Sequence, residues 1–268
     1  MPLVSKFIAV KFSANTNWRV EDTLTNEAAL QILVNHEPFS VTMRTPGSER
    51  DLVRGLLYAE NAYENLQGPF RYQTMELGED GIPSVVNVLL SDEEKAPGAD
   101  SKRSLTSVSS CGICGKEDLS AIELCGDPIA DDVQFTPVQI AAMFEAMSSV
   151  QDVFLKSGGS HAAAMFNAQS ELMVLKEDIG RHNAVDKVIG YCLNNDLLSN
   201  AKCLLVSGRV SFEIISKAHR ARVPVLAAIS APSSLAVQTS QECGLTLLGF
   251  CRGEHLTAYA HPERIQVR

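Results

Sequence analysis

The chain has 268 residues, 45% of them hydrophobic, so it can bury the core of one large domain or of two smaller ones. Its formal net charge of −9 excludes broad nucleic-acid binding through phosphate neutralisation, although a local pocket for one phosphorylated ligand stays compatible with it. No apolar run approaches the ~18 residues of a membrane span, so we expect a cytoplasmic protein with no membrane partner and with its seven cysteines as reduced thiols.

The first ninety residues predict strands around one helix. Asn35-His36-Glu37-Pro38 separates two apolar runs and predicts a hairpin turn. Ser48-Glu49-Arg50-Asp51 resembles a capping box with Asp in place of Glu, and the apolar residues that follow it recur at helical spacing. The predicted strands cover residues 7–12, 30–34, 39–44, 70–77 and 85–90. We therefore expect a strand-rich N-terminal subdomain over residues 1–90.

Residues 91–110 have a different composition. Large apolar side chains are nearly absent, so this segment cannot bury enough surface to offset the entropy lost on ordering. We predict a flexible loop that leads into Cys-Gly-Ile-Cys-Gly at 111–115, so that residues 91–115 form one loop carrying a cysteine pair.

Residues 116–268 alternate between predicted helices and strands. Thr136-Pro137 is typical of a helix N-cap followed by proline at the first helical position. Predicted strands lie at 172–175, 203–206, 225–229 and 245–250, and predicted helices lie near 181–193, 211–221 and 234–242. Short apolar strands separated by amphipathic helices predict an α/β domain whose sheet is largely parallel and has helices on both faces.

Cys111 and Cys114 are the most informative residues of the sequence. Neighbouring glycines reduce steric bulk around both thiols, and Lys116, near the expected start of a helix, favours thiolate. An exposed thiolate of this kind can accept sulfur as a persulfide and release it to a second partner. The spacing alone leaves two other interpretations open, a zinc site and a redox dithiol. There is no second C-x-x-C to complete a four-cysteine zinc site.

Three loops follow the carboxyl ends of predicted parallel strands, where ligands of such sheets collect. They are Ser207-Gly208-Arg209, the Ser-rich segment that starts at Ser230, and Cys251-Arg252-Gly253-Glu254-His255. Arginine and free helix N-termini suit phosphate, so the loops together predict a site for a nucleotide-like ligand. The alternative is that the serines and glycines only cap helices and close turns. Neither G-x-G-x-x-G nor a P-loop is present.

A fourth group of polar residues lies in Gly158-Gly159-Ser160-His161 and in the stretch from Glu177 to His182. Two histidines, two adjacent carboxylates and Arg181 fall at the ends of predicted elements, where sites often lie. A single histidine is more often an ordinary surface or core residue, so this group remains a secondary candidate.

Several of these segments resemble the FdhD family of formate dehydrogenase accessory proteins. The matching stretches are CGICG at 111–115, GGSHAAAMF at 158–166, EDIGRHNAVDKVIG at 177–190, LLVSGRVSFEIISKA at 204–218 and the segment from 230 to 265. The resemblance is strong over about the last 160 residues and weaker at 30–60. It favours sulfur transfer over zinc binding and over dithiol redox chemistry for the cysteine pair.

The resemblance implies a cytidine-deaminase-like layered sheet without a zinc site, so no structural metal is expected. It implies a sulfurtransferase that receives sulfur from a cysteine desulfurase as a persulfide on Cys111, with Cys114 as the partner thiol. The substrate would be the molybdenum bis(molybdopterin guanine dinucleotide) cofactor, sulfurated before it enters formate dehydrogenase. GDP would then be a partial mimic of the cofactor. A homodimer is one possible assembly, and a non-catalytic cofactor chaperone is the alternative function.

The resemblance places cofactor binding on Phe250, Cys251, Arg252, Gly253, Glu254 and His255, and the strand-end loops add Ser207, Gly208, Arg209 and Ser230. A common family pattern has a basic residue, Pro-Gly and a second basic residue after Phe-Cys, whereas this chain has Arg-Gly-Glu-His. A carboxylate at Glu254 is unfavourable beside phosphate, so Arg252 is the stronger candidate for a contact. His255 replaces the second basic residue when it is protonated, or as a neutral donor.

Overall fold

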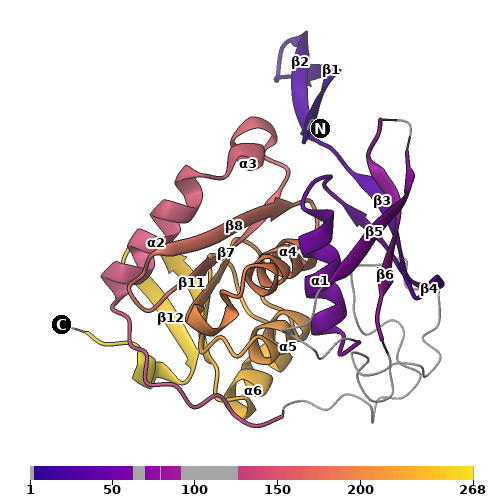
Figure 1. Ribbon diagram of the computed structural model, residues 1–268. Helices are drawn as coiled ribbons and strands as arrows, with labels where there is room; N and C mark the ends of the chain where they lie inside the picture. Colours follow the sequence, from indigo (N-terminus) through magenta and orange to yellow (C-terminus); the bar gives the residue numbers. More distant parts are fainter. Residues whose placement is uncertain (1–2, 63–69, 79, 92–125, 268) are drawn as a thin grey trace.

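The computed structural model describes residues 3–62, 70–78, 80–91 and 126–267 (Figure 1). These residues form a two-stranded hairpin, a four-stranded sheet and a six-stranded sheet. The predicted loop at 91–110 falls almost entirely outside the described residues, as do Cys111 and Cys114. Among the described residues, no helix has the length and apolar character needed to cross a membrane.

The four-stranded sheet belongs to the N-terminal part of the chain and has the order β4-β3-β6-β5. Its strands are β3 (Ala28–Val34), β4 (Glu37–Arg44), β5 (Arg71–Leu77) and β6 (Pro83–Leu89). Helix α1 (Glu49–Ala59) covers one face, where Leu52, Val53 and Leu57 pack against Leu30, Ile32 and other strand residues. The predicted turn at 35–38 does join two antiparallel strands, since Val34 pairs with Glu37.

The hairpin of β1 (Val4–Phe12) and β2 (Asn17–Thr25) projects from the rest of the molecule (Figure 1). Sequence patterns predicted most of β1 but not β2. The reason is that Asp22 interrupts the alternation of Trp18, Val20 and Leu24, so the apolar pattern of β2 is too short to indicate a strand.

The six-stranded sheet has the order β12-β11-β10-β9-β7-β8. Its strands are β7 (His161–Phe166), β8 (Leu172–Asp178), β9 (Cys203–Val206), β10 (Val225–Ala228), β11 (Thr246–Arg252) and β12 (His255–Ala260). The prediction of a largely parallel sheet was wrong. Only β9, β10 and β11 are parallel to one another, whereas β7, β8 and β12 pair antiparallel. Short turns join β7 to β8 and β11 to β12, and such turns can connect only antiparallel neighbours.

Helices cover both faces of this sheet, so the α/β fold class is confirmed (Figure 1). One face packs against α4 (Arg181–Asn194), α5 (Phe212–Arg220) and α6 (Ser234–Glu242), and the other packs against α2 (Pro137–Ser149). Along β9, Leu204 and Val206 face the first core while Cys203 and Leu205 face the second. Burial on both faces explains why the strands are apolar without alternation. The remaining helices are α3 (Asp152–Ser157) and the 3₁₀ turns η2 (Leu198–Asn200) and η3 (Pro262–Arg264).

Helices α1 and α4 join the two sheets and cross at a pair of glycines. A Cβ atom at Gly55 would lie 1.9 Å from the carbonyl oxygen of Asp186, and one at Gly190 would lie 1.8 Å from that of Asp51. No side chain fits in so little space, so glycine at both positions lets the two backbones touch. The four-stranded sheet with α1 and the six-stranded sheet with α4 are therefore in direct contact along this crossing.

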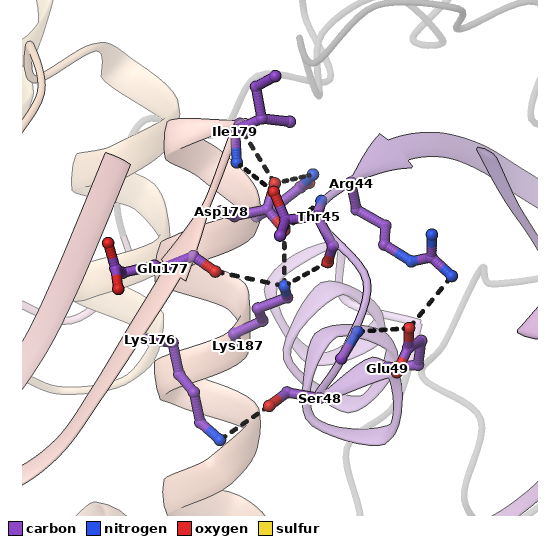
Figure 2. Close-up of polar contacts among 12 residues, drawn as sticks. Arg44, Thr45, Ser48, Glu49, Lys176, Glu177, Asp178, Ile179 and Lys187 are labelled. Atoms are coloured by element: carbon purple, nitrogen blue, oxygen red, sulfur yellow. Dashed lines mark hydrogen bonds and ion pairs between the residues drawn. The ribbon is translucent and has the colours of Figure 1, made fainter. Parts of the chain in front are cut away.

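A buried ion pair strengthens the same contact (Figure 2). Lys187 Nζ lies 2.7 Å from Asp178 Oδ2 and donates to the carbonyl oxygen of Thr45 at 2.8 Å. The Asp178 carboxylate also accepts the backbone N–H groups of Thr45 and Gly180. Thr45 belongs to the segment that links β4 to α1, so this ion pair ties the N-terminal subdomain to α4.

Two predicted helix starts had different outcomes. Thr136 is the N-cap of α2, and its hydroxyl accepts the N–H of Gln139 in a complete capping box. The predicted box at Ser48 was wrong, because Ser48 has a left-handed backbone (φ 59°) and its side chain makes no cap hydrogen bond. Its hydroxyl accepts a hydrogen bond from Lys176 Nζ instead, and Glu49 accepts the N–H of Gly47 (Figure 2).

Candidate functional site at one edge of the six-stranded sheet

The carboxyl ends of β9, β10 and β11 lie side by side because these strands are parallel neighbours. The predicted strand-end loops therefore meet at one edge of the sheet, and backbone hydrogen bonds join them. The N–H of Val210 donates to Ala231 O at 3.2 Å, and that of Phe250 donates to Ser230 O at 3.3 Å. The structure thus brings together Ser207, Gly208, Arg209, Ser230 and the segment that begins at Phe250.

Two of these loops lead into helices, as the sequence predicted. Ser233 caps α6, because its side chain accepts the N–H of Ala236 at 3.2 Å. Ser211 precedes α5 but makes no cap hydrogen bond, so the first-turn N–H groups of α5 are not satisfied by this side chain. An uncapped helix N-terminus at the end of a strand is suited to hold an anionic group.

The turn between β11 and β12 carries the segment from Phe250 to His255. Phe250 has a left-handed backbone (φ 53°) and is 45% exposed, and the strand register shifts between Gly249 and Arg252. Arg252, Gly253, Glu254 and His255 are all exposed. Among the described residues Arg252 makes no ion pair, so its guanidinium is available to a ligand.

Cys251 differs from its neighbours in this segment. Its side chain is 4% exposed and packs in the core between the sheet and α2. Burial raises the pKa of its thiol to about 11, so the thiol stays protonated at neutral pH. At Cys251 a ligand at the turn would meet backbone atoms, because the side chain points into the core.

The other described cysteines are also remote from solvent. Cys192, Cys203 and Cys251 are free and buried. Burial raises the pKa of Cys192 to about 12 and that of Cys203 still further. Cys243 is disulfide-bonded, which corrects the expectation that every cysteine is a reduced thiol. None of the three free thiols is suited to nucleophilic chemistry.

The secondary candidates around Glu177 have structural partners. Glu177 accepts the N–H groups of Val153 and Phe154, both at 2.8 Å, and so caps α3. It also accepts the hydroxyl of Ser160 at 2.7 Å. Asp178 is occupied by Lys187 (Figure 2). The two adjacent carboxylates therefore hold elements together and are not available to a ligand.

His161, Arg181 and His182, which the sequence placed in the secondary candidate group, come to the same edge of the sheet. His161 begins β7, which is antiparallel to β9, so it lies beside the carboxyl end of β9. His182 Nε2 lies 2.8 Å from Glu213 Oε2 and 3.1 Å from the hydroxyl of Ser211. The only sequence signal was the position of these residues at the ends of predicted elements.

Within the described part of the chain, no group of three or more His, Cys, Asp or Glu residues is arranged to hold a metal ion. His261 and Glu263, which form an H-x-E pattern, bond to each other at 2.9 Å. What the described edge of the sheet offers a ligand is therefore a set of helix N-termini, arginines and one exposed aromatic ring.

Comparison with known proteins gives consistent matches over nearly the whole chain. Residues 25–266 match the model of the FdhD/NarQ family. The chain is 42% identical to the sulfur carrier protein FdhD of Streptomyces coelicolor over 254 residues, which cover 92% of this chain and 90% of that protein. It is 38% identical to the sulfur carrier protein FdhD of Sulfolobus acidocaldarius, with 92% of each chain covered.

The fold also matches a solved structure from Desulfotalea psychrophila, described as a formate dehydrogenase accessory protein. The TM-score is 0.78 and the sequence identity is 20%, with 99% of this chain and 100% of that chain covered. This structural likeness shows only that the two chains share an α/β fold. The family is shown by the sequence matches. The chain belongs to the FdhD/NarQ family.

Proposed function

We propose that this protein is a sulfur carrier that holds sulfur as a persulfide on Cys111 and passes it to a molybdenum cofactor. The observation that carries the proposal is the Cys-Gly-Ile-Cys-Gly motif at 111–115 in a chain 42% identical to proteins named sulfur carrier protein FdhD. The cysteines whose side chains are described and free are buried, which leaves Cys111 and Cys114 as the stronger candidates for an accessible thiolate.

The sulfur donor in this proposal is a cysteine desulfurase. The Cys111 thiolate attacks the terminal sulfur of the donor persulfide, a new S–S bond forms, and the donor thiolate leaves. For delivery, the Cys114 thiolate attacks the inner sulfur of the Cys111 persulfide. This step forms a Cys111–Cys114 disulfide and releases hydrosulfide, which becomes the sulfur ligand of the metal. A cellular thiol reductant then restores both cysteines.

The substrate would be molybdenum bis(molybdopterin guanine dinucleotide), sulfurated before it enters formate dehydrogenase. In this proposal the edge of the six-stranded sheet would bind the guanosine diphosphate portion. Arg209 and Arg252 would contact phosphate oxygens beside the uncapped N-terminus of α5, and the exposed ring of Phe250 would stack on the base. The protein would act in the cytoplasm, either as a homodimer or as a monomer.

Sulfur loading is the direct test. The purified protein is incubated with a cysteine desulfurase and cysteine, and its mass is measured intact and after digestion. We expect one added sulfur atom on the peptide that contains Cys111, absent in Cys111→Ala. Cys114→Ala should still load sulfur but should deliver less of it to a client formate dehydrogenase. A protein that binds cofactor but never gains sulfur would instead be a non-catalytic chaperone.

A separate measurement tests the nucleotide portion of the proposal. GDP should bind the protein in calorimetry and should compete with the cofactor, because only the guanosine diphosphate portion is recognised at the sheet edge. Guanosine is the matched control, since it lacks the phosphates that Arg209 and Arg252 would contact. Absence of heat and of thermal stabilisation at high GDP concentration would place cofactor binding elsewhere.

A further inference from the structure

Three basic side chains from different elements converge beside the carboxyl end of β9. They are His161 at the start of β7, Arg181 at the start of α4 and Arg209 in the loop after β9. A Cβ atom at Gly208 would lie 3.2 Å from His161 Nδ1 and 3.5 Å from Arg181 Cβ, so these two side chains meet over the backbone of Gly208. Ser207 holds the loop after β9 against the start of β7, because its hydroxyl accepts the N–H of Ala162 at 2.9 Å.

Neighbouring carboxylates do not neutralise this group. Asp178, which faces His161 across the strand pair, is already bound by Lys187 at 2.7 Å and by the N–H of Gly180 at 2.8 Å. Among the described residues, neither Arg181 nor Arg209 makes an ion pair. The group therefore carries an excess of positive charge in a protein whose formal net charge is −9.

The second carboxylate nearby, Glu213, is likewise occupied. Burial alone would raise its pKa, but the hydrogen bond and charge of His182 and the Ser211 hydroxyl outweigh burial, so the pKa lies below its usual range. Glu213 is therefore ionised at neutral pH, and its charge is directed at His182, 2.8 Å away. Among the described residues, Glu213 makes no ion pair with either arginine.

Helix α4 presents an open N-terminus to the same place. Gly180 is its N-cap and supplies no side-chain hydrogen bond. Arg181 Nε is buried without a hydrogen-bond partner, and so is Nδ1 of His182, a residue only 4% exposed. Buried polar atoms without partners are rare in folded proteins, and here two adjacent residues have one each. Arg181 Nε belongs to the group of basic residues and would gain a partner from a ligand, and His182 is its neighbour in the first turn of α4.

We propose that His161, Arg181 and Arg209, with the first turn of α4, form a binding site for a tetrahedral oxyanion of the phosphate or sulfate class. The two guanidinium groups would contact the oxyanion through charge-assisted hydrogen bonds, and the helix N-terminus would add its partial positive charge. The site does not require that the chain carries sulfur. It lies at the ends of β9 and β7, which stand two and three positions from β11 in the sheet. It shares Arg209 with the proposed nucleotide site and does not include the turn that carries Arg252.

Binding at this site should take up a proton. Burial lowers the pKa of His161, and the charges of Arg181, Arg209 and His182 lower it further, while Asp178 alone opposes them. His161 is therefore neutral at neutral pH in the free protein. A bound dianion offsets the arginine charges, raises the pKa of His161 and makes it a charged donor. Affinity for the oxyanion should consequently rise as the pH falls from about 8 to about 6.

Sulfate is the probe for the test, because it keeps the same charge over this pH range. Calorimetry on the full chain, in buffers with different ionisation enthalpies, gives both the affinity and the protons taken up. We expect Arg181→Gln to weaken sulfate binding at least about tenfold and Arg181→Lys to weaken it less. His161→Gln should abolish proton uptake. Arg19→Gln, which removes the same charge near the tip of the projecting hairpin, is the control and should change neither quantity.

Further arms identify the source of the oxyanion and guard against misfolding. GDP that displaces sulfate would show that the site holds nucleotide phosphate, and GDP that binds alongside sulfate would show a separate ligand. If Arg181→Gln does not fold, Arg209→Gln replaces it, because Arg209 is exposed. Sulfate binding that is unchanged in both arginine variants, or independent of pH in the parent protein, would overturn the proposal, whatever the outcome for sulfur loading.

Discussion

Replacing Lys187 by methionine should destabilise the protein strongly, because this residue is the counter-charge of a buried carboxylate. The lysine side chain is 2% exposed and that of Asp178 is 0% exposed. Methionine keeps most of the apolar stem but removes the charge and the donor to Thr45 O. Asp178 would remain buried with only neutral donors, from the backbone of Thr45 and Gly180 and from Asn183.

The size of the effect follows from these contacts. Removing one partner of a buried ion pair typically costs about 3–5 kcal/mol. The neutral donors that still reach Asp178 place this case near the lower end, and the lost hydrogen bond to Thr45 adds about 1 kcal/mol. We therefore expect Lys187→Met to lower the free energy of unfolding by roughly 3–4 kcal/mol, which corresponds to a fall in Tm of about 10 °C for a chain of this size.

Urea and thermal unfolding followed by circular dichroism give the comparison. Lys6→Met is the matched control, because Lys6 pairs with Glu21 on the exposed hairpin and its loss should leave the midpoint unchanged. The double variant Lys187→Met with Asp178→Asn should be less destabilised than the sum of the single variants, since neither charge is then left alone. Additive effects, or a loss below about 1 kcal/mol for Lys187→Met, would refute the role assigned to this pair.

The other predictions concern the helix crossing, the cysteines and the turn after β11. Gly190→Ala should cost at least about 3 kcal/mol, because the new Cβ would lie 1.8 Å from a backbone oxygen, whereas Gly78→Ala meets its nearest atom at 3.5 Å and should be tolerated in the same urea titration. Cys111→Ala should leave the urea midpoint unchanged and abolish activation of a client formate dehydrogenase; full client activity would exclude the persulfide role. Arg252→Ala should weaken GDP binding by roughly 1–3 kcal/mol in calorimetry, and an unchanged affinity would move the phosphate contact to Arg209.

Sequence patterns predicted the fold well where one face of an element is buried and the other is not. Helix α1 and strand β3 have this character, and both were predicted at nearly their observed positions. Strand β7 was missed because its sequence, His-Ala-Ala-Ala-Met-Phe, is rich in alanine, which is uncommon in strands, and lacks the valine and leucine that mark β9 and β10. Strand β12 was not predicted either. The antiparallel pairing of β7, β8 and β12 was missed because it depends on contacts between segments that no local pattern encodes.

The candidate site was predictable only in part, because local patterns locate loops but do not show which polar residues pair with each other. The loops at Ser207 and Ser230 follow apolar strands in sequence, so their convergence could be inferred from the parallel order of β9 and β10. Arg181 could not be separated from Asp178 or Lys187, since all three stand in one polar stretch of the chain. Only the structure shows that Asp178 and Lys187 satisfy each other while Arg181 is left without an ionic partner among the described residues.

The glycine crossing of α1 and α4 has a consequence for how the chain folds during synthesis. Gly55 and Gly190 touch the opposite helix but stand 135 positions apart in the sequence, and closing so long a loop costs roughly 4 kcal/mol of chain entropy. A ribosome adding about 5–20 residues per second needs roughly 7–27 s to make the intervening chain. Throughout that interval α1 can cover its own sheet, but its other side has no partner. On that side Tyr58 packs in the folded protein against the core of the six-stranded sheet. The nascent protein therefore leaves this side of α1, with Tyr58, Asp51 and Arg54, without its partners until α4 emerges.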